Sequence, residues 1–466
     1  MVSMTRLEGR ITGTEMEWGL LARASVDDDY EQPDDKMAEK VIKARHEGLY
    51  RCISFGMLSN GGRLYVDVGQ HVEYATPEDT SFMGTVANEI AGENILYDAA
   101  ETLRNDGVFR NVLLSKRVVD DELKTWGYHM SFCADAEKLR IDVNGLRPLG
   151  AHLATLNVLT GAGAVIPTRS GAEFVVSQKT LNLNCDFSQS SHQNYQPLIS
   201  LRSEALADPE LFSRVHISSM DANMSPWATW IKLGTTSIII RMMEEGFLRP
   251  IELEGQMFET ALQVAHDPNL ESKTTLEGGK TIRPIDIQMR LLAQAKRFAK
   301  TEYVSDEERA VLREWERALG DMTHDPELLI DRVEWVARRA ALRRFMGKHG
   351  LSLTNDIVLE KDRQWSYIGP LGIGSKLREG LWKKWMPNER IKDAYLVPPA
   401  STRAFVRGAM IRQYYEQGRT DVQANWEYVG VTGQKTKIMP NPYEQRTYDA
   451  AELEAPDIDD YPMLEC

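Results

Sequence analysis

One short stretch near the start of the chain constrains the fold most. Asn60-Gly61-Gly62 is a turn signal, and residues 63–68 then alternate polar and apolar side chains. Because successive side chains of a strand point to opposite faces, the apolar residues of this stretch share one face. Arg63, Tyr65 and Asp67 then lie together on the other face. The sequence therefore predicts a half-buried strand whose second face carries groups suited to chemistry.

More polar groups follow this strand closely. They are His71, Glu73 and Thr76. Aspartate is depleted in strands, so Asp67 on the polar face favours a functional site. A structural interpretation stays equally open, in which Arg63 and Asp67 pair across a surface and His71 is a histidine satisfied within the core.

Two glutamates on the first predicted strand form a second acidic feature. The segment from Arg10 to Trp18 reads as a strand, and Glu15 and Glu17 lie two residues apart on it, so both carboxylates point to the same face. Like charges held together favour a bound cation. Carboxylate oxygens of this kind suit Mg²⁺, which keeps several waters and shares its coordination with substrate phosphates. The alternative is a solvent-facing edge strand, because charged residues are mostly exposed.

Length and charge limit the class of protein. The 466 residues allow two to three domains, or one large catalytic domain with a small appendage. Apolar residues make up 42% and charged residues 27%, which is ordinary for a soluble globular chain. The formal net charge of −14 argues against nonspecific nucleic-acid binding, because neutralising phosphates needs a basic surface. An acidic partner would need a local basic patch.

Cysteine usage and hydropathy favour a cytoplasmic protein. The four cysteines are scattered and lack the spacing of a zinc knuckle or a redox motif, which fits a reducing cytosol. The polar N-terminus has no apolar core of a signal peptide, and no stretch approaches the roughly 20 apolar residues that span a bilayer. We therefore expect neither secretion nor a membrane partner.

Several common catalytic motifs are missing. Residues 277–281 have the end of a phosphate-binding loop, but Thr274 stands where its first glycine belongs. Gly372-Ile373-Gly374 lacks the third glycine of a dinucleotide fingerprint. The nine histidines show no zinc-ligand spacing, and the nucleophile elbow of α/β-hydrolases is absent. If ATP binds, a phosphate-binding loop of this type does not hold it.

The remaining pattern predicts helices, loops and one boundary. Helical periodicity marks residues 37–47, 229–245 and most of 285–346, with Gly48 and Gly246 placed to end the first two and Ser305 with Glu308 as a capping box. Residues 160–178 read as a glycine-rich turn followed by β-branched residues, and the acidic run 27–35 reads as a loop. Pro398-Pro399 marks a boundary, so we expect a catalytic domain over residues 1–400 and a small C-terminal domain over residues 401–466 that ends in an acidic tail.

Two long motifs carry a resemblance to a known family. They are Gly13 to Gly19 and Asn60 to Thr76. Further matching stretches follow in order through most of the chain, at residues 160–163, 177–178, 216–225, 233–236, 398–399, 402–404 and 407–408. Together they resemble the family of Pup ligases and Pup deamidases.

The resemblance implies a fold and a set of site residues. The fold is α+β and glutamine-synthetase-like, with a curved, mainly antiparallel sheet, helices and a small C-terminal domain. Carried over residue by residue, Glu15, Tyr65 and Glu73 resemble the family's Mg²⁺ ligands, Arg63, Thr76 and Trp426 its ATP contacts, and Asp67 its catalytic base.

The resemblance also implies a reaction and partners. The expected enzyme is an ATP-dependent carboxylate-amine ligase that uses ATP and Mg²⁺. It would join the C-terminal glutamate side chain of a Pup-like small protein tag to lysine-bearing target proteins through a glutamyl phosphate, within the pupylation pathway that leads to proteasomal degradation.

Ligase, deamidase and non-catalytic relative are three alternatives within this resemblance. The deamidase carries a long insertion between the first strand and the Asn-Gly turn, whereas only 41 residues, 19 to 59, separate those motifs here, which resembles the ligase. This chain departs from the family at some polar pocket positions, among them Met130, Ser203 and Leu206. These departures motivate the third alternative, a non-catalytic protein that binds nucleotide or tag.

Overall fold

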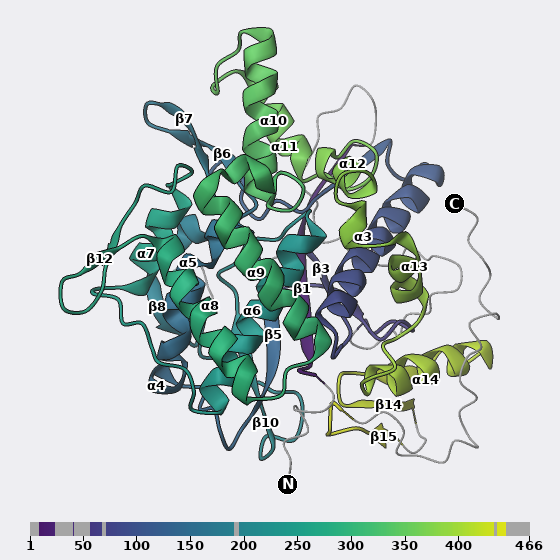
Figure 1. Cartoon of the computed structure of the whole chain (residues 1–466). Helices are drawn as coiled ribbons and strands as arrows, with labels where there is room; N and C mark the ends of the chain where they lie inside the picture. The colour runs from purple at the N-terminus through teal and green to yellow at the C-terminus, as the bar shows by residue number, and fades with distance from the viewer. Residues whose placement is uncertain are drawn as a thin grey trace. The chain divides into compact units, whose positions relative to one another are not determined.

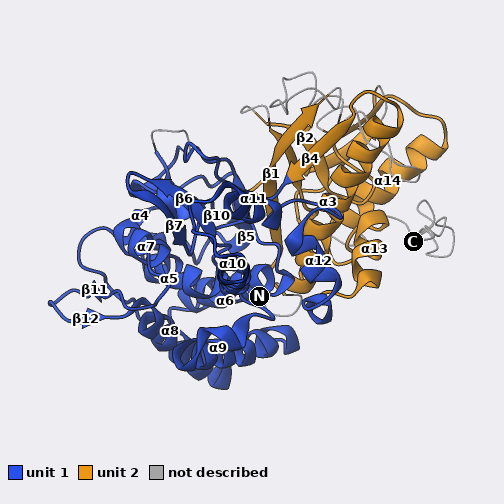
Figure 2. Cartoon of the chain, turned by 90° about the horizontal axis from the view of Figure 1, so that it is seen from above, with its two compact units in different colours: residues 1–7, 115–204, 210–385 blue, residues 8–114, 205–209, 386–466 orange. Residues whose placement is uncertain are grey.

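Figure 1 shows a computed structural model of the chain. It describes residues 9–23, 41, 56–67, 71–190, 195–432 and 436–443. The chain forms two compact units (Figure 2): unit 1 takes in residues 1–7, 115–204 and 210–385, and unit 2 takes in residues 8–114, 205–209 and 386–466. Each unit is thus built from segments that are distant in sequence.

Unit 2 contains an antiparallel set of strands with one long helix. The strands are β1 (Thr12–Arg23), β2 (Arg63–Val66) and β3 (Val72–Ala75), in the order β2-β3-β1, and β4 (Asn111–Ser115) also pairs with β1. Helix α3 (Phe82–Asn105) begins where the Ser81 side chain accepts a hydrogen bond from the Gly84 amide at 3.1 Å. It packs against α13 (Asn388–Leu396).

The turn before β2 depends on its glycines. Gly61 has a φ of +85°, which favours glycine over other residues. A side chain on Gly62 would come within 2.6 Å of the Tyr74 hydroxyl. The Asn60 side chain completes the turn by accepting from the Gly62 amide at 3.0 Å. The predicted turn at residues 60–62 is confirmed, and it fixes where β2 starts.

The C-terminal segments of unit 2 form a small helix-and-sheet layer. Helix α14 (Ala404–Glu416) packs against β13 (Val422–Ala424) and β14 (Tyr428–Val431), and β15 (Lys437–Ile438) completes a three-stranded antiparallel sheet. Its core consists of buried apolar residues, namely Met57, Val406, Ile411, Val422, Ala424, Val429 and Met439. Met57 belongs to the N-terminal part of the chain, so this layer is joined to the start of unit 2 through its core.

Unit 1 contains four further strands of a sheet and a hairpin. Strands β5 (Tyr128–Asp135), β10 (Phe212–Ile217), β9 (Pro197–Ser200) and β8 (Cys185–Ser188) follow in that order, antiparallel except for β8 and β9. In β5 buried and partly buried residues alternate along the whole strand. Strands β6 (Ala164–Thr168) and β7 (Gly171–Val175) form the hairpin.

Helices make up the rest of unit 1. The central ones are α5 (Gly150–Thr160), α6 (Pro226–Glu244), α8 (Pro284–Thr301) and α9 (Asp306–His324), and α8 and α9 run side by side in Figure 1. The others are α4 (Val143–Leu146), α7 (Met257–Ala265), α10 (Glu334–His349), α11 (Asp356–Trp365) and α12 (Ile373–Glu379), and a short hairpin joins β11 (Thr274–Thr275) to β12 (Thr281–Ile282). None of the described helices is long and apolar enough to cross a bilayer.

Most predicted elements are confirmed within the described residues. The first strand is longer than predicted, the predicted helix at 229–245 is α6, and Gly246 follows it with a φ of +62°. The capping box at Ser305 and Glu308 starts α9. Strand β2 ends at Val66, before the predicted end. Some predictions lie outside the described residues. They concern Val68, the acidic loop at 27–35, the acidic tail at 452–466 and the helix at 37–47, of which only residue 41 is described. The domain boundary near residue 400 stays a prediction.

Candidate active site

One face of the unit 2 sheet gathers the residues that the sequence singles out. Glu15 and Glu17 occupy partly buried positions of β1, between buried neighbours. Across the antiparallel ladder, Glu17 stands opposite Glu73, and Glu73 stands opposite Tyr65. Directly opposed residues share a face, so these side chains form one row across three strands. We call Glu15, Glu17, Tyr65, Asp67 and Glu73 the acidic face.

Three carboxylates of the acidic face converge. Glu17, Asp67 and Glu73 each offer an oxygen, and these oxygens lie within 4.8 Å of one another. Glu73 is buried, and the other two are partly buried. Three carboxylates this close repel each other unless a proton or a cation intervenes. The arrangement therefore favours a bound cation.

Tyr65 and Glu73 are coupled by a hydrogen bond. The Tyr65 hydroxyl donates to the Glu73 carboxylate. Burial raises the pKa of Glu73 well above its usual range, and the negative charges of Glu15 and Glu17 add to this effect. Burial and the charge of Glu73 likewise raise the pKa of Tyr65, so its phenol stays neutral. Both shifts come first from burial and then from the neighbouring carboxylates, and Arg63 offsets part of the shift of Tyr65.

Arg63 lies one row along from this cluster. On the ladder it stands opposite Ala75, which also stands opposite Glu15. Its guanidinium carbon lies 3.8 Å from the centroid of the Tyr65 ring, so the two side chains stack. Stacking leaves the in-plane N–H groups of the guanidinium directed around the ring edge, where they are suited to bind phosphate oxygens.

Thr76 follows β3 and is buried. Its hydroxyl oxygen accepts a hydrogen bond from the Thr14 amide at 3.0 Å, and the Thr76 amide donates to the Thr14 carbonyl at 2.9 Å. Thr76 therefore extends the pairing of β1 with β3, and its O–H group is the part of the side chain suited to donate to a ligand.

Trp426 comes from a different part of unit 2. It lies between β13 and β14 and packs, partly buried, against the core of the C-terminal layer. The Arg407 guanidinium carbon lies 5.0 Å from the centroid of the Trp426 ring, and Arg407 Nη1 donates to the Trp426 carbonyl at 2.9 Å. These contacts fix the indole of Trp426 from one side.

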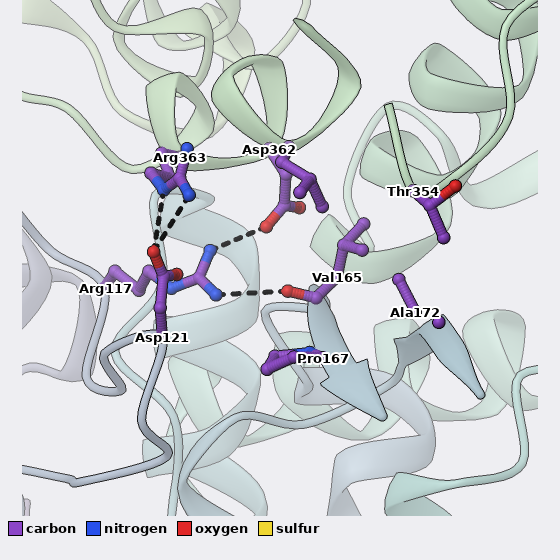
Figure 3. A pocket seen from close by; sticks show the side chains of 10 residues that line it. Arg117, Asp121, Val165, Pro167, Ala172, Thr354, Asp362 and Arg363 are labelled. Carbon is purple, nitrogen blue, oxygen red and sulfur yellow. Dashed lines mark hydrogen bonds and ion pairs between the residues drawn. The ribbon is translucent and has the colours of Figure 1, made fainter. Parts of the chain in front are cut away.

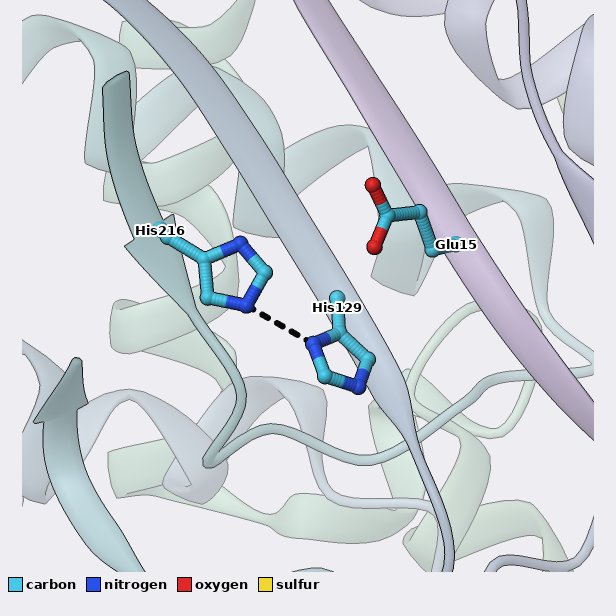
Figure 4. Close-up of side chains that lie close together, drawn as sticks. All are labelled: Glu15, His129 and His216. Carbon is cyan, nitrogen blue, oxygen red and sulfur yellow. Dashed lines mark hydrogen bonds between the residues drawn. The ribbon is translucent and has the colours of Figure 1, made fainter. Parts of the chain in front are cut away.

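Unit 1 carries a basic cluster on its sheet. The side chains of His129 and His216 face each other, with 2.8 Å between His129 Nδ1 and His216 Nε2 (Figure 4). Arg214 donates to His216 Nδ1 at 2.6 Å, and burial together with Arg214 lowers the pKa of His216 well below its usual range. His216 is therefore neutral and donates through Nε2 to His129.

A cavity in unit 1 lies among residues that the sequence did not select. It measures about 310 Å³ and lies between the β6–β7 hairpin and α11 (Figure 3). Its charged lining groups are already paired, Arg117 with Asp362 at 2.6 Å and Arg363 with Asp121 at 2.8 Å. The predicted site residues are all in unit 2, so this cavity is not the predicted site.

The acidic face fits the metal that the sequence predicts. Its donors are carboxylate and phenol oxygens, the hard ligands that Mg²⁺ prefers. A cation would also offset the repulsion that raises the pKa of Glu73. Glu15, Tyr65 and Glu73 were predicted as ligands, and the structure places Glu17 and Asp67 beside Glu73 as further oxygen donors. The individual roles of these residues stay predictions.

The departures from the family pattern occupy different environments. Met130 is fully buried in β5, on the strand face opposite to His129. Ser203 is exposed, and Leu206 is 41% exposed with a φ of +50°. Met130 therefore contributes to the core of unit 1. The structure does not explain the departures at Ser203 and Leu206.

Comparisons with known proteins identify the family and agree with the fold. A sequence profile of the family described as Pup-ligase protein matches residues 10–430. The Pup–protein ligase of Acidimicrobium ferrooxidans is 31% identical over 457 residues, covering 94% of this chain and 97% of the relative. The Pup–protein ligase of Kineococcus radiotolerans is 29% identical over 454 residues, with the same coverage.

Two solved structures share the fold. The Pup ligase PafA in complex with Pup matches with a TM-score of 0.84 and 24% identity, over 97% of this chain and 92% of that chain. PafA in complex with ADP matches with a TM-score of 0.75 and 23% identity, over 91% and 94%. This chain belongs to the Pup ligase family. The predicted family and α+β fold class are thereby confirmed.

Sequence reasoning missed some residues that the structure places near the predicted ones. Glu17 was noted only as the neighbour of Glu15, because its position opposite Glu73 depends on the register of β1 with β3. Arg403 and Arg407 were part of a matching stretch without a role, and both pair with Glu78 across more than 300 residues of sequence. No local spacing could have indicated these contacts.

Proposed function

We propose that this protein is an ATP-dependent ligase that joins the C-terminal glutamate side chain of a Pup-like protein tag to a lysine of a target protein. Membership in the Pup ligase family supports the reaction class. The convergence of Glu17, Asp67 and Glu73 within 4.8 Å is the observation that carries the proposal, since such a site suits a metal-bound nucleotide.

The proposed reaction has two steps. A carboxylate oxygen of the tag attacks the γ-phosphorus of ATP, and ADP leaves, which gives a glutamyl phosphate. The lysine ε-amine then attacks the acyl carbon, phosphate leaves, and an isopeptide bond forms. The amine loses one proton in this second step, and we assign the Asp67 carboxylate as the base that accepts this proton.

The residues of unit 2 divide this work. Glu15, Tyr65 and Glu73 would hold Mg²⁺, and the bound ion supplies neutralisation of phosphate charge. Arg63 stacks on Tyr65, which orients its N–H groups for phosphate oxygens. Thr76 would donate its hydroxyl to the nucleotide, and Trp426 would offer its ring as a stacking surface.

A deamidase is the second candidate function. The same acidic face could activate water in place of a lysine amine, which would remove the amide of a tag that ends in glutamine. The 41 residues between the first strand and the Asn-Gly turn favour the ligase over this alternative.

Trapping the acyl phosphate tests the proposal. The protein is incubated with Mg-ATP, a Pup that ends in glutamate, and hydroxylamine, and the tag is analysed by mass spectrometry. We expect a tag that carries a C-terminal hydroxamate, formed only when ATP is present. Conversion of a glutamine-ended tag to the glutamate form, with no hydroxamate from the glutamate form, would instead establish the deamidase.

A further inference from the structure

A buried ion-pair cluster lies beside the predicted nucleotide contacts in unit 2. Glu78 pairs with Arg403 at 2.9 Å and with Arg407 at 2.5 Å. The Thr402 hydroxyl donates to the Glu78 carbonyl at 2.7 Å. We call Glu78, Thr402, Arg403 and Arg407 the Glu78 clamp. It ties the segment after β3 to the start of α14.

Glu78 in the clamp is charged. Burial by itself would raise the pKa of Glu78, but Arg407 and Arg403 outweigh this effect and lower it to about 2. The two arginines are 0% and 2% exposed. A buried pair of this kind adds little net stability compared with apolar packing, because desolvating the charges offsets their attraction. Its directed bonds instead fix the position of the segment after β3 relative to the start of α14.

One guanidinium connects three parts of the predicted nucleotide site. Besides Glu78, Arg407 donates to the Gly61 carbonyl at 2.8 Å and to the Trp426 carbonyl at 2.9 Å, and it lies over the Trp426 ring. Gly61 precedes Arg63 by two residues, and Glu78 follows Thr76 by two residues. Each predicted ATP contact, Arg63, Thr76 or Trp426, is therefore either bonded to Arg407 itself or lies two residues in sequence from a residue that is.

We propose that Arg407 is a positioning residue that sets the relative placement of Arg63, Thr76 and Trp426 for the nucleotide. This inference rests on the proposed function, because it needs a nucleotide at those residues. Arginine is suited to the task, since its planar fork makes several directed bonds at once. Lysine at this position would keep the charge and lose the fork.

Arg403 offers a matched control inside the same clamp. It bonds the same carboxylate, but its other donors go to the Met439 carbonyl at 2.8 Å and the Leu206 carbonyl at 2.6 Å. Neither of these residues adjoins a predicted ATP contact in sequence. A substitution of Arg403 therefore perturbs the clamp and its stability, while the bonds of Arg407 to Gly61 and Trp426 stay in place.

The test compares R407K with R403K in the full chain. Binding of Mg-ADP is measured by titration calorimetry without tag, and urea unfolding gives the stability of each variant. We expect R407K to weaken Mg-ADP binding about tenfold or more, whereas R403K changes it less than about threefold at a similar loss of stability. In the ligation assay, R407K should raise the KM for ATP and leave kcat within about threefold, because positioning acts on nucleotide binding.

Two results of this comparison would overturn the inference. Equal weakening of Mg-ADP binding by both variants would reduce Arg407 to a structural role, and unchanged binding by R407K would remove the role altogether. A double variant with W426A keeps the test informative if R407K is unstable: E78Q combined with W426A should weaken Mg-ADP binding by less than the sum of the two separate losses, because part of the effect of the clamp passes through Trp426. Additive losses would contradict the proposal. Failure of the wild-type protein to bind Mg-ADP would instead refute the proposed function itself.

Discussion

At the scale of single residues, Glu73 decides what the acidic face can bind. It is buried, it accepts from Tyr65, and its oxygens lie near those of Glu17 and Asp67. Without a cation this carboxylate favours its protonated form, because burial and the neighbouring charges raise its pKa. The face is therefore arranged for a ligand that brings positive charge.

Glu17 allows a prediction at this scale. Replacing it by glutamine keeps the shape of the side chain and removes one of the three converging charges. We expect E17Q to raise the Mg²⁺ concentration for half-maximal Mg-ADP binding by about tenfold, equivalent to about 1.4 kcal/mol. E416Q, an exposed change of the same charge on α14, is the control. A value for E17Q equal to that of E416Q would exclude Glu17 from the metal site.

At the scale of elements, the helical core of unit 1 holds a histidine in its neutral form. His152 on α5 is fully buried, lies 3.1 Å from the Thr236 hydroxyl of α6 and packs edge-on against Trp315 of α9. Burial lowers the pKa of His152 from 6.5 to about 3. The three helices therefore pack around a group that cannot take up a proton without leaving the core.

Acid should destabilise unit 1 through His152. The unfolded state binds a proton below pH 6.5, whereas the folded state binds it only near pH 3, so stability is lost as the pH falls through this window. Between pH 7 and pH 5 this group should remove about 2 kcal/mol of unfolding free energy. Urea unfolding of the wild type and H152Q at both pH values measures the difference. H349Q, at an exposed histidine, should keep the wild-type dependence, and equal slopes in all three would contradict the assignment.

Elements with local signals could be predicted from the sequence. The alternation at residues 63–68 and the capping box at Ser305 depend on neighbours a few residues away. The structure confirms the capping box and a strand at Arg63–Val66, in which Leu64 is buried and Val66 is partly buried. The polar face of β2 was predictable for the same reason. The row of Tyr65, Glu73 and Glu17 was not, because strand register is set by pairing of segments that are distant in sequence.

At the scale of the whole molecule, the chain assembles each unit from distant segments. The Glu78–Arg407 pair spans 329 residues and the His129–His216 pair spans 87, so neither could be found by spacing. The matching stretches at 402–404 and 407–408 marked Arg403 and Arg407 without indicating their partners. The family resemblance supplied the site residues that physical patterns alone left open, and the structure adds the contacts that hold them.

The most direct test of the central claim is the covalent product. Wild-type protein and D67N are each incubated with Mg-ATP, a Pup that ends in glutamate and a lysine-bearing acceptor, and the mixture is analysed by intact mass. We predict for the wild type an adduct lighter than the summed masses by one water, and for D67N a loss of the transfer rate by about 10²-fold or more, with Mg-ADP binding retained. An adduct formed equally fast by D67N would remove Asp67 from the mechanism, and no adduct from a wild-type protein that binds Mg-ADP would contradict the ligase.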